Sequence, residues 1–79
     1  MVLPVASSRD IEQAIARYCA AHSHSADTAD GVRRMWLADP SLPLALVEAA
    51  LESLVKRGVI SARRLSDGTA VYFTRGALR

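Results

Sequence analysis

Two histidines and two aspartates lie within nine residues of this chain, between His22 and Asp30, shortly after its single cysteine, Cys19. Thiolate, imidazole and carboxylate groups are the ligands that proteins use to bind zinc. The spacing C-x2-H-x-H-x2-D of Cys19, His22, His24 and Asp27 matches no standard zinc pattern, and structural zinc sites usually contain paired cysteines. We therefore expect no metal site, and we interpret the stretch as a junction between two helices.

A catalytic role for the same residues is also disfavoured by the sequence. Cys19 and His22 have the i, i+3 spacing at which a thiol nucleophile and its base can meet on one helix. Cys19 lies within an apolar stripe, however, where cysteine usually acts as a small inert hydrophobic residue. The chain has no glycine-rich phosphate loop and no paired acids at a plausible cleft. We expect no enzymatic activity, no cofactor and no small-molecule ligand.

Length and composition predict a single small domain. The chain has 79 residues, of which 51% are apolar and 23% are charged. We expect a short leader over residues 1–6 and one domain over residues 7–79. A single cysteine suits a reducing cytoplasm, and no apolar run approaches the ~20 residues of a membrane span, so we expect a cytoplasmic protein. Residues 1–40 carry a net charge of −1 and residues 41–79 one of +3, which puts any basic surface in the C-terminal half.

Apolar periodicity predicts a first helix over residues 8–22, opened by a capping box of Ser7 and Asp10. Its apolar stripe reaches His22, which can fill a corner of the core.

A second helix is predicted over residues 28–38, with Asp27 as its N-cap. We expect it to bury Val32, Met35 and Trp36 and to turn Arg33 and Arg34 outward. Gly31, inside this helix, costs about 1 kcal/mol relative to alanine unless another part of the backbone must pass close to it.

The C-terminal half predicts a third helix followed by a β-hairpin. The helix spans residues 42–57 and ends at Gly58, which favours a left-handed C-terminal cap. Two β-prone runs, residues 59–65 and 69–75, flank Asp67 and Gly68, and Asp-Gly between such runs is a strong hairpin signal. The predicted fold class is α+β.

Three short helices followed by a hairpin resemble the winged-helix variant of the helix-turn-helix, over about residues 7–75. The most specific stretch is "ALESLVKRGVISARRLSDGTAVYF", which resembles the third helix, glycine turn and two-stranded wing of bacterial winged-helix proteins. "ADTADGVRRMWL" is similar to a stretch of small uncharacterised bacterial proteins of this shape. The resemblance implies a DNA-associated, regulator-like module whose third helix enters the major groove and whose wing touches phosphates. The implied nucleic-acid contacts are the basic residues Arg33, Arg34, Lys56, Arg57, Arg63, Arg64 and Arg75.

The third helix departs from the DNA-binding pattern of that family. Its outward face carries Glu48 and Glu52 and no basic or amide side chain before Lys56, whereas base reading relies on Arg, Lys, Asn or Gln. The helix also carries more apolar residues than one buried stripe needs. A protein partner or a homodimer is therefore the alternative to DNA, and its predicted interface is Leu42, Ala45, Glu48, Ala49 and Glu52.

Overall fold

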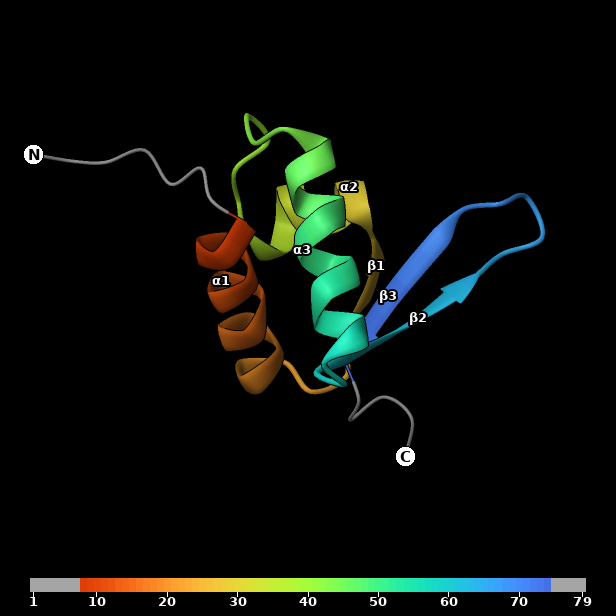
Figure 1. Ribbon diagram of the computed structural model, residues 1–79, viewed down its shortest axis with the longest axis horizontal. Coiled ribbons are helices and arrows are strands. Elements are labelled where there is room, and N and C mark those ends of the chain that lie inside the picture. The colour runs from red at the N-terminus through yellow and green to blue at the C-terminus, as the bar shows by residue number, and fades with distance from the viewer. Residues whose placement is uncertain (1–7, 75–79) are drawn as a thin grey trace, which may run out of the picture.

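The computed structural model describes residues 8–74, which form an α+β arrangement of helices and one antiparallel sheet (Figure 1). The elements are α1 (Ser8–Ala21), β1 (Ala26–Thr28), α2 (Ala29–Gly31), the π-helical turn η1 (Val32–Trp36), α3 (Leu44–Lys56), β2 (Ile60–Arg64) and β3 (Ala70–Thr74). The three predicted helical segments are confirmed, with α2 and η1 together forming the second. The predicted leader, Ser7 and Arg75 lie outside the described residues.

The core lies where α1, η1 and α3 meet the sheet. α1 packs beside α3, and the turn end of the β2–β3 hairpin extends away from both helices (Figure 1). The residues that the described part of the chain buries here are Ile11, Ile15, Val32, Trp36, Val47, Ala50, Leu51, Leu54, Ile60 and Tyr72. Their steps of three and four along α1 and α3 confirm the predicted helical stripes.

The sheet has three strands in the order β1-β3-β2, whereas the sequence predicted two. β1 pairs antiparallel with β3, with Ala26 opposite Phe73 and Thr28 opposite Val71. The prediction of Asp27 as N-cap was therefore wrong, because Asp27 lies in this strand. Thr28 caps α2 instead: its Oγ1 accepts a hydrogen bond from the backbone N–H of Gly31 at 3.1 Å.

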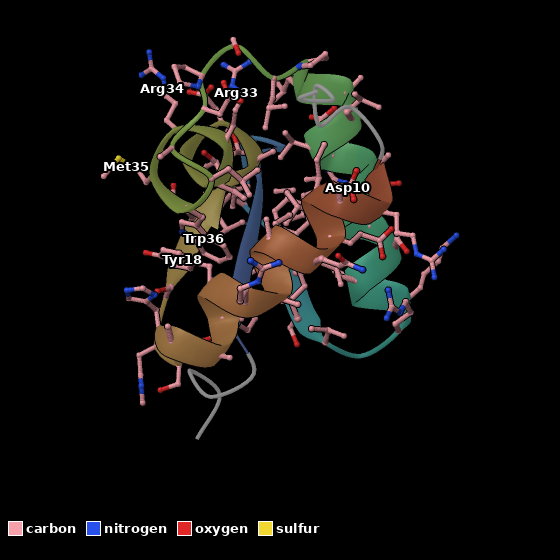
Figure 2. All side chains as sticks on the ribbon, turned by 90° about the vertical axis from the view of Figure 1, so that its left-hand side faces the viewer. Asp10, Tyr18, Arg33, Arg34, Met35 and Trp36 are labelled. Carbon is pink, nitrogen blue, oxygen red and sulfur yellow. The ribbon has the colours of Figure 1, made fainter. Side chains whose placement is uncertain are left out.

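Met35 is the clearest error in the predicted second helix. The backbone N–H of Leu37 donates to the carbonyl of Val32 at 2.9 Å, a five-residue step that defines a π-turn. This wider turn brings Trp36, rather than Met35, back over the buried face of Val32. Met35 is consequently 70% exposed and lies at the rim of the molecule, while Trp36 is 8% exposed and faces Tyr18 (Figure 2).

The two predicted turn glycines are confirmed. Gly58 follows α3 with a φ of 77°, and Gly68 lies in the hairpin turn with a φ of 92°. The turn is closed by the N–H of Leu65, which donates to the carbonyl of Thr69 at 2.7 Å. The Oδ1 of Asp67 accepts from the N–H of Thr69 at 2.9 Å, and hydrogen bonding from Thr69, led by this backbone N–H, holds the pKa of Asp67 below its ordinary value. No helix in residues 8–74 is long and apolar enough to cross a membrane.

Candidate functional site

The register of the hairpin decides which of its side chains face α3. Ala62 lies opposite Tyr72 and Arg64 lies opposite Ala70, so these four share one face of the sheet with buried Ile60. Arg63 is one residue out of phase and belongs to the other face, because successive strand residues alternate. The face that carries Tyr72 and Arg64 is the one turned towards α3.

A groove runs between α3 and this face of the hairpin. It consists of two hollows of about 400 and 350 Å3, which share the lining residues Glu52, Arg64, Ala70 and Tyr72. The first hollow continues to Lys56 and Arg63, near the end of α3. The second continues to Glu48, Leu44 and Asp30, near the start of α3. We call the two together the α3–hairpin groove.

Tyr72 lies at the shared centre of the groove. The residue is only 6% exposed, and its hydroxyl, which is accessible from the groove, forms no hydrogen bond with any residue of the described chain. Burial raises the pKa of Tyr72, and the nearby carboxylates of Glu52 and Glu48 raise it further, while Arg64 acts in the opposite direction. The phenol is therefore held in its neutral form, with an O–H free to donate.

The two glutamates of the groove form no ion pair within residues 8–74. Glu48 and Glu52 are exposed and form no ion pair or hydrogen bond there. Their i, i+4 spacing on α3 makes them mutually repulsive, by about 0.2–0.5 kcal/mol. Arg64 forms no ion pair with them; its Nη1 donates to the carbonyl of Gly68 at 2.7 Å within the hairpin turn.

Asp30, unlike these glutamates, forms ion pairs, and its partners are two arginines of the second helix. Arg33 forms an ion pair with Asp30 Oδ1, and the Nε of Arg34 lies 3.9 Å from Asp30 Oδ2. The negative charge at this edge of the groove is therefore balanced.

The prediction that Arg33 turns outward was wrong. Its side chain is 22% exposed, and its guanidinium donates to the carbonyl of Leu42 at 3.2 Å as well as to Asp30. It thereby ties the second helix to the loop before α3. Arg34, by contrast, is exposed as predicted, and Figure 2 shows both arginines on the same edge of the molecule.

Arg57 also has a structural partner. Its Nη1 lies 2.6 Å from the Oε1 of Glu12 on α1, on the side of α3 away from the hairpin. Of the basic residues predicted to bind nucleic acid, Lys56 and Arg63 are exposed and form no hydrogen bond or ion pair within residues 8–74. The basic surface is therefore smaller than the sequence suggested, and Arg75 lies outside the described residues.

Most of the predicted protein-binding residues do form one exposed surface on α3. Ala45, Glu48, Ala49 and Glu52 are all exposed. Leu42 is the exception: it is half-buried, packs against the core and provides the carbonyl that Arg33 binds. Leu44, at 36% exposure, adds an apolar side chain at the start of the helix.

Cys19 and His22, near the helix junction, both lie in surroundings that the packing of the chain explains. Cys19 is half-buried, and burial raises the pKa of its thiol. His22 is exposed rather than part of the core; its ring stacks on Tyr18 at 4.0 Å between centroids, and its Nδ1 lies 3.1 Å from the carbonyl of Tyr18. In the part of the chain from residue 8 to residue 74, no three His, Cys, Asp or Glu side chains are grouped so as to hold a metal ion.

The sequence did not identify Tyr72 as part of a site. Alternation along residues 70–74 indicates that Ala70, Tyr72 and Thr74 share a face, but only the strand register and the packing of α3 place that face against Glu48 and Glu52. Searches with the whole chain find no matching protein-family model, no matching curated protein and no matching solved structure.

Proposed function

We propose that this chain is a winged-helix module that binds a protein partner through α3 and the α3–hairpin groove, and that it has no catalytic activity. The fold part of the proposal is supported by the order of elements, in which α3 is followed at once by a hairpin lying beside it. It is also supported by the sequence resemblance over residues 26–37 and 50–73. A short strand, β1, adds to the hairpin from the segment between the first two helices.

The observation that favours a protein partner over DNA is the pair of glutamates on the exposed face of α3, which form no ion pair in the described residues. A helix that enters the major groove brings its outward side chains between two rows of phosphates, where carboxylates are repelled. Glu48 and Glu52 occupy this position on α3, and Arg64 is held back in its own hairpin turn. Exposed Leu44, Ala45 and Ala49 supply a small apolar surface beside them, which suits a peptide chain better than DNA.

DNA association is the second candidate, and the exposed cations Lys56 and Arg63 favour it. A few phosphate contacts of this kind give weak, salt-sensitive binding, with dissociation constants of roughly 10⁻⁴–10⁻⁶ M. A dimer of the module would double the number of contacts. Such binding would use the end of α3 and the hairpin, and would leave the centre of the groove empty.

An amide-resolved NMR titration with a mixed-sequence DNA duplex separates the two candidates. Under the protein-partner proposal, any shifts are confined to residues 56–65 and vanish at moderate salt, because only a few phosphates are contacted. Saturable shifts at the amides of Glu48 and Glu52 that persist at moderate salt would overturn it in favour of DNA. If such binding were unchanged by Arg63→Ala/Arg64→Ala, the wing would have no part in it.

A random peptide library displayed on phage tests the protein-binding surface directly. We expect wild-type protein to select peptides whose binding is lost in Ala49→Arg, which fills the centre of the α3 surface. Ala20→Arg, at an exposed alanine on α1, is the matched control and should retain binding. Selected peptides that bind Ala49→Arg as well as wild type would show that α3 is not the interface. Sedimentation of both variants tests whether a second copy of the chain occupies the same surface.

A further inference from the structure

The α3–hairpin groove has opposite charges at its two ends. Glu48 lies on the half nearer the start of α3, Glu52 lies at the shared centre, and Lys56 lies at the other end. None of the three forms an ion pair within the described residues. A ligand that neutralised only one sign of charge would leave the other uncompensated, so the ligand that fits best carries both signs.

Tyr72 adds a hydroxyl to the polar lining of the groove. The residue is 6% exposed overall, but its hydroxyl is not a buried atom left without a hydrogen-bond partner, so the O–H is accessible from the groove. The hydroxyl of Tyr72 forms no hydrogen bond in the described chain, and its side chain lines both hollows of the groove. The neutral O–H is therefore available to a main-chain carbonyl of a bound peptide.

The geometry of α3 sets the distance between the two charges. Glu48 and Lys56 are eight residues apart, which corresponds to about 12 Å along a helix that rises 1.5 Å per residue. An extended peptide advances about 3.3 Å per residue, so this distance corresponds to about four residues.

We propose that the groove binds an extended segment of a partner protein that carries a Lys or Arg side chain and, about four residues away, an Asp or Glu side chain. The basic side chain lies against Glu48, where it relieves the repulsion between Glu48 and Glu52. The acidic side chain lies against Lys56, and the hydroxyl of Tyr72 donates to the peptide backbone between them. This inference rests on the proposed function, since it names the partner of the same surface.

The test uses two synthetic peptides and the full chain. The probe is the acetylated and amidated heptapeptide Gly-Arg-Thr-Val-Thr-Glu-Gly, and the control peptide has glutamine in place of both charged residues. We expect the probe to cause saturable NMR shifts at the amides of Glu48, Glu52 and Tyr72, with binding at least about tenfold tighter than that of the control. Equal binding of the two peptides, or no saturable shift with the probe, would overturn the proposal.

Charge reversal distinguishes recognition from a general loss of structure. Glu48→Lys/Glu52→Lys should lose the probe and gain the peptide Gly-Glu-Thr-Val-Thr-Glu-Gly, an exchange that a misfolded variant would not show. Gln13→Lys, which adds a lysine on exposed α1, is the matched control and should bind as wild type does. If the reversed variant still bound the original probe as tightly as wild type, the glutamates would not be its site.

The peptide library separates failure of this inference from failure of the proposed function. Selected peptides that require Ala49 but contain no basic residue would leave the proposed function standing and overturn the charge pattern. A library whose selected peptides all bind Ala49→Arg and Glu48→Lys/Glu52→Lys as well as wild type would overturn both.

Discussion

The carboxylate of Asp27 lies directly over the Cα of Gly31. A Cβ at position 31 would lie 1.8 Å from the Oδ1 of Asp27, so no larger residue fits while that carboxylate keeps its place. The same Oδ1 accepts the backbone N–H of Thr28 at 2.8 Å, which holds the carboxylate where it is. The close neighbour that accounts for a glycine here is therefore a side chain, and not the backbone that the sequence suggested.

The Asp27–Gly31 contact predicts non-additive stabilities. In an Asp27→Ala background, Gly31→Ala should raise the free energy of unfolding by up to about 1 kcal/mol, because alanine favours the helix. In the wild-type background this gain should vanish or reverse, since Asp27 must move away and release the N–H of Thr28. The expected coupling is about 1–3 kcal/mol in urea unfolding. Additive effects would mean that Asp27 moves aside at no cost.

Arg33 and Arg34 should differ sharply despite being neighbours. Arg33→Ala removes hydrogen bonds to Leu42 and Asp30 and should lower the free energy of unfolding by about 1–3 kcal/mol. Arg34→Ala, at an exposed side chain, should change it by less than about 0.5 kcal/mol. Urea unfolding of the two variants side by side provides the measurement. Equal losses would contradict the assignment of Arg33 as the link between the second helix and the loop before α3.

Local signals explain what the sequence predicted well. α3 repeats its apolar residues every three or four positions, and Gly58 and the Asp67–Gly68 turn are fixed by backbone conformations that glycine alone adopts freely. Each of these features depends on a few adjacent residues. The boundaries of α1, α3 and the hairpin were therefore predicted to within two residues over the described part of the chain.

Features that depend on distant residues were missed. β1 contains Ala26 and Asp27, which are poor strand formers, and it is a strand because β3 offers it a partner. Met35 was assigned to the core because an ordinary helix period was assumed through a π-turn. The groove was missed for the same kind of reason. Tyr72 meets α3 across more than fifteen positions of sequence, and the strand register together with the packing of α3 sets that contact.

The groove predicts an alkaline loss of stability that depends on its glutamates. Because the pKa of Tyr72 is raised on folding, the folded state keeps its proton above the ordinary tyrosine pKa of about 10, where the unfolded state has lost it. This contribution is complete below that value and is lost as the pH rises through the folded pKa. In a Tyr18→Phe background, tyrosinate absorbance should give a midpoint above the ordinary value. Adding Glu48→Gln/Glu52→Gln should lower it, and an unchanged midpoint would mean that burial alone raises the pKa.

Because Tyr18 stacks on Trp36, we expect the Tyr18 ring to hold α1 against η1. Figure 2 shows Tyr18 next to Trp36. The two ring centroids lie 4.9 Å apart at an interplanar angle of 10°, and the ring of His22 also stacks on Tyr18. Tyr18→Ala removes a half-buried ring and should cost about 2–4 kcal/mol in urea unfolding, with a change in the fluorescence of Trp36. His22→Ala removes only the exposed outer ring and should cost less than about 1 kcal/mol. A large loss in His22→Ala would instead make the histidine part of the core, as its place in the apolar stripe first suggested.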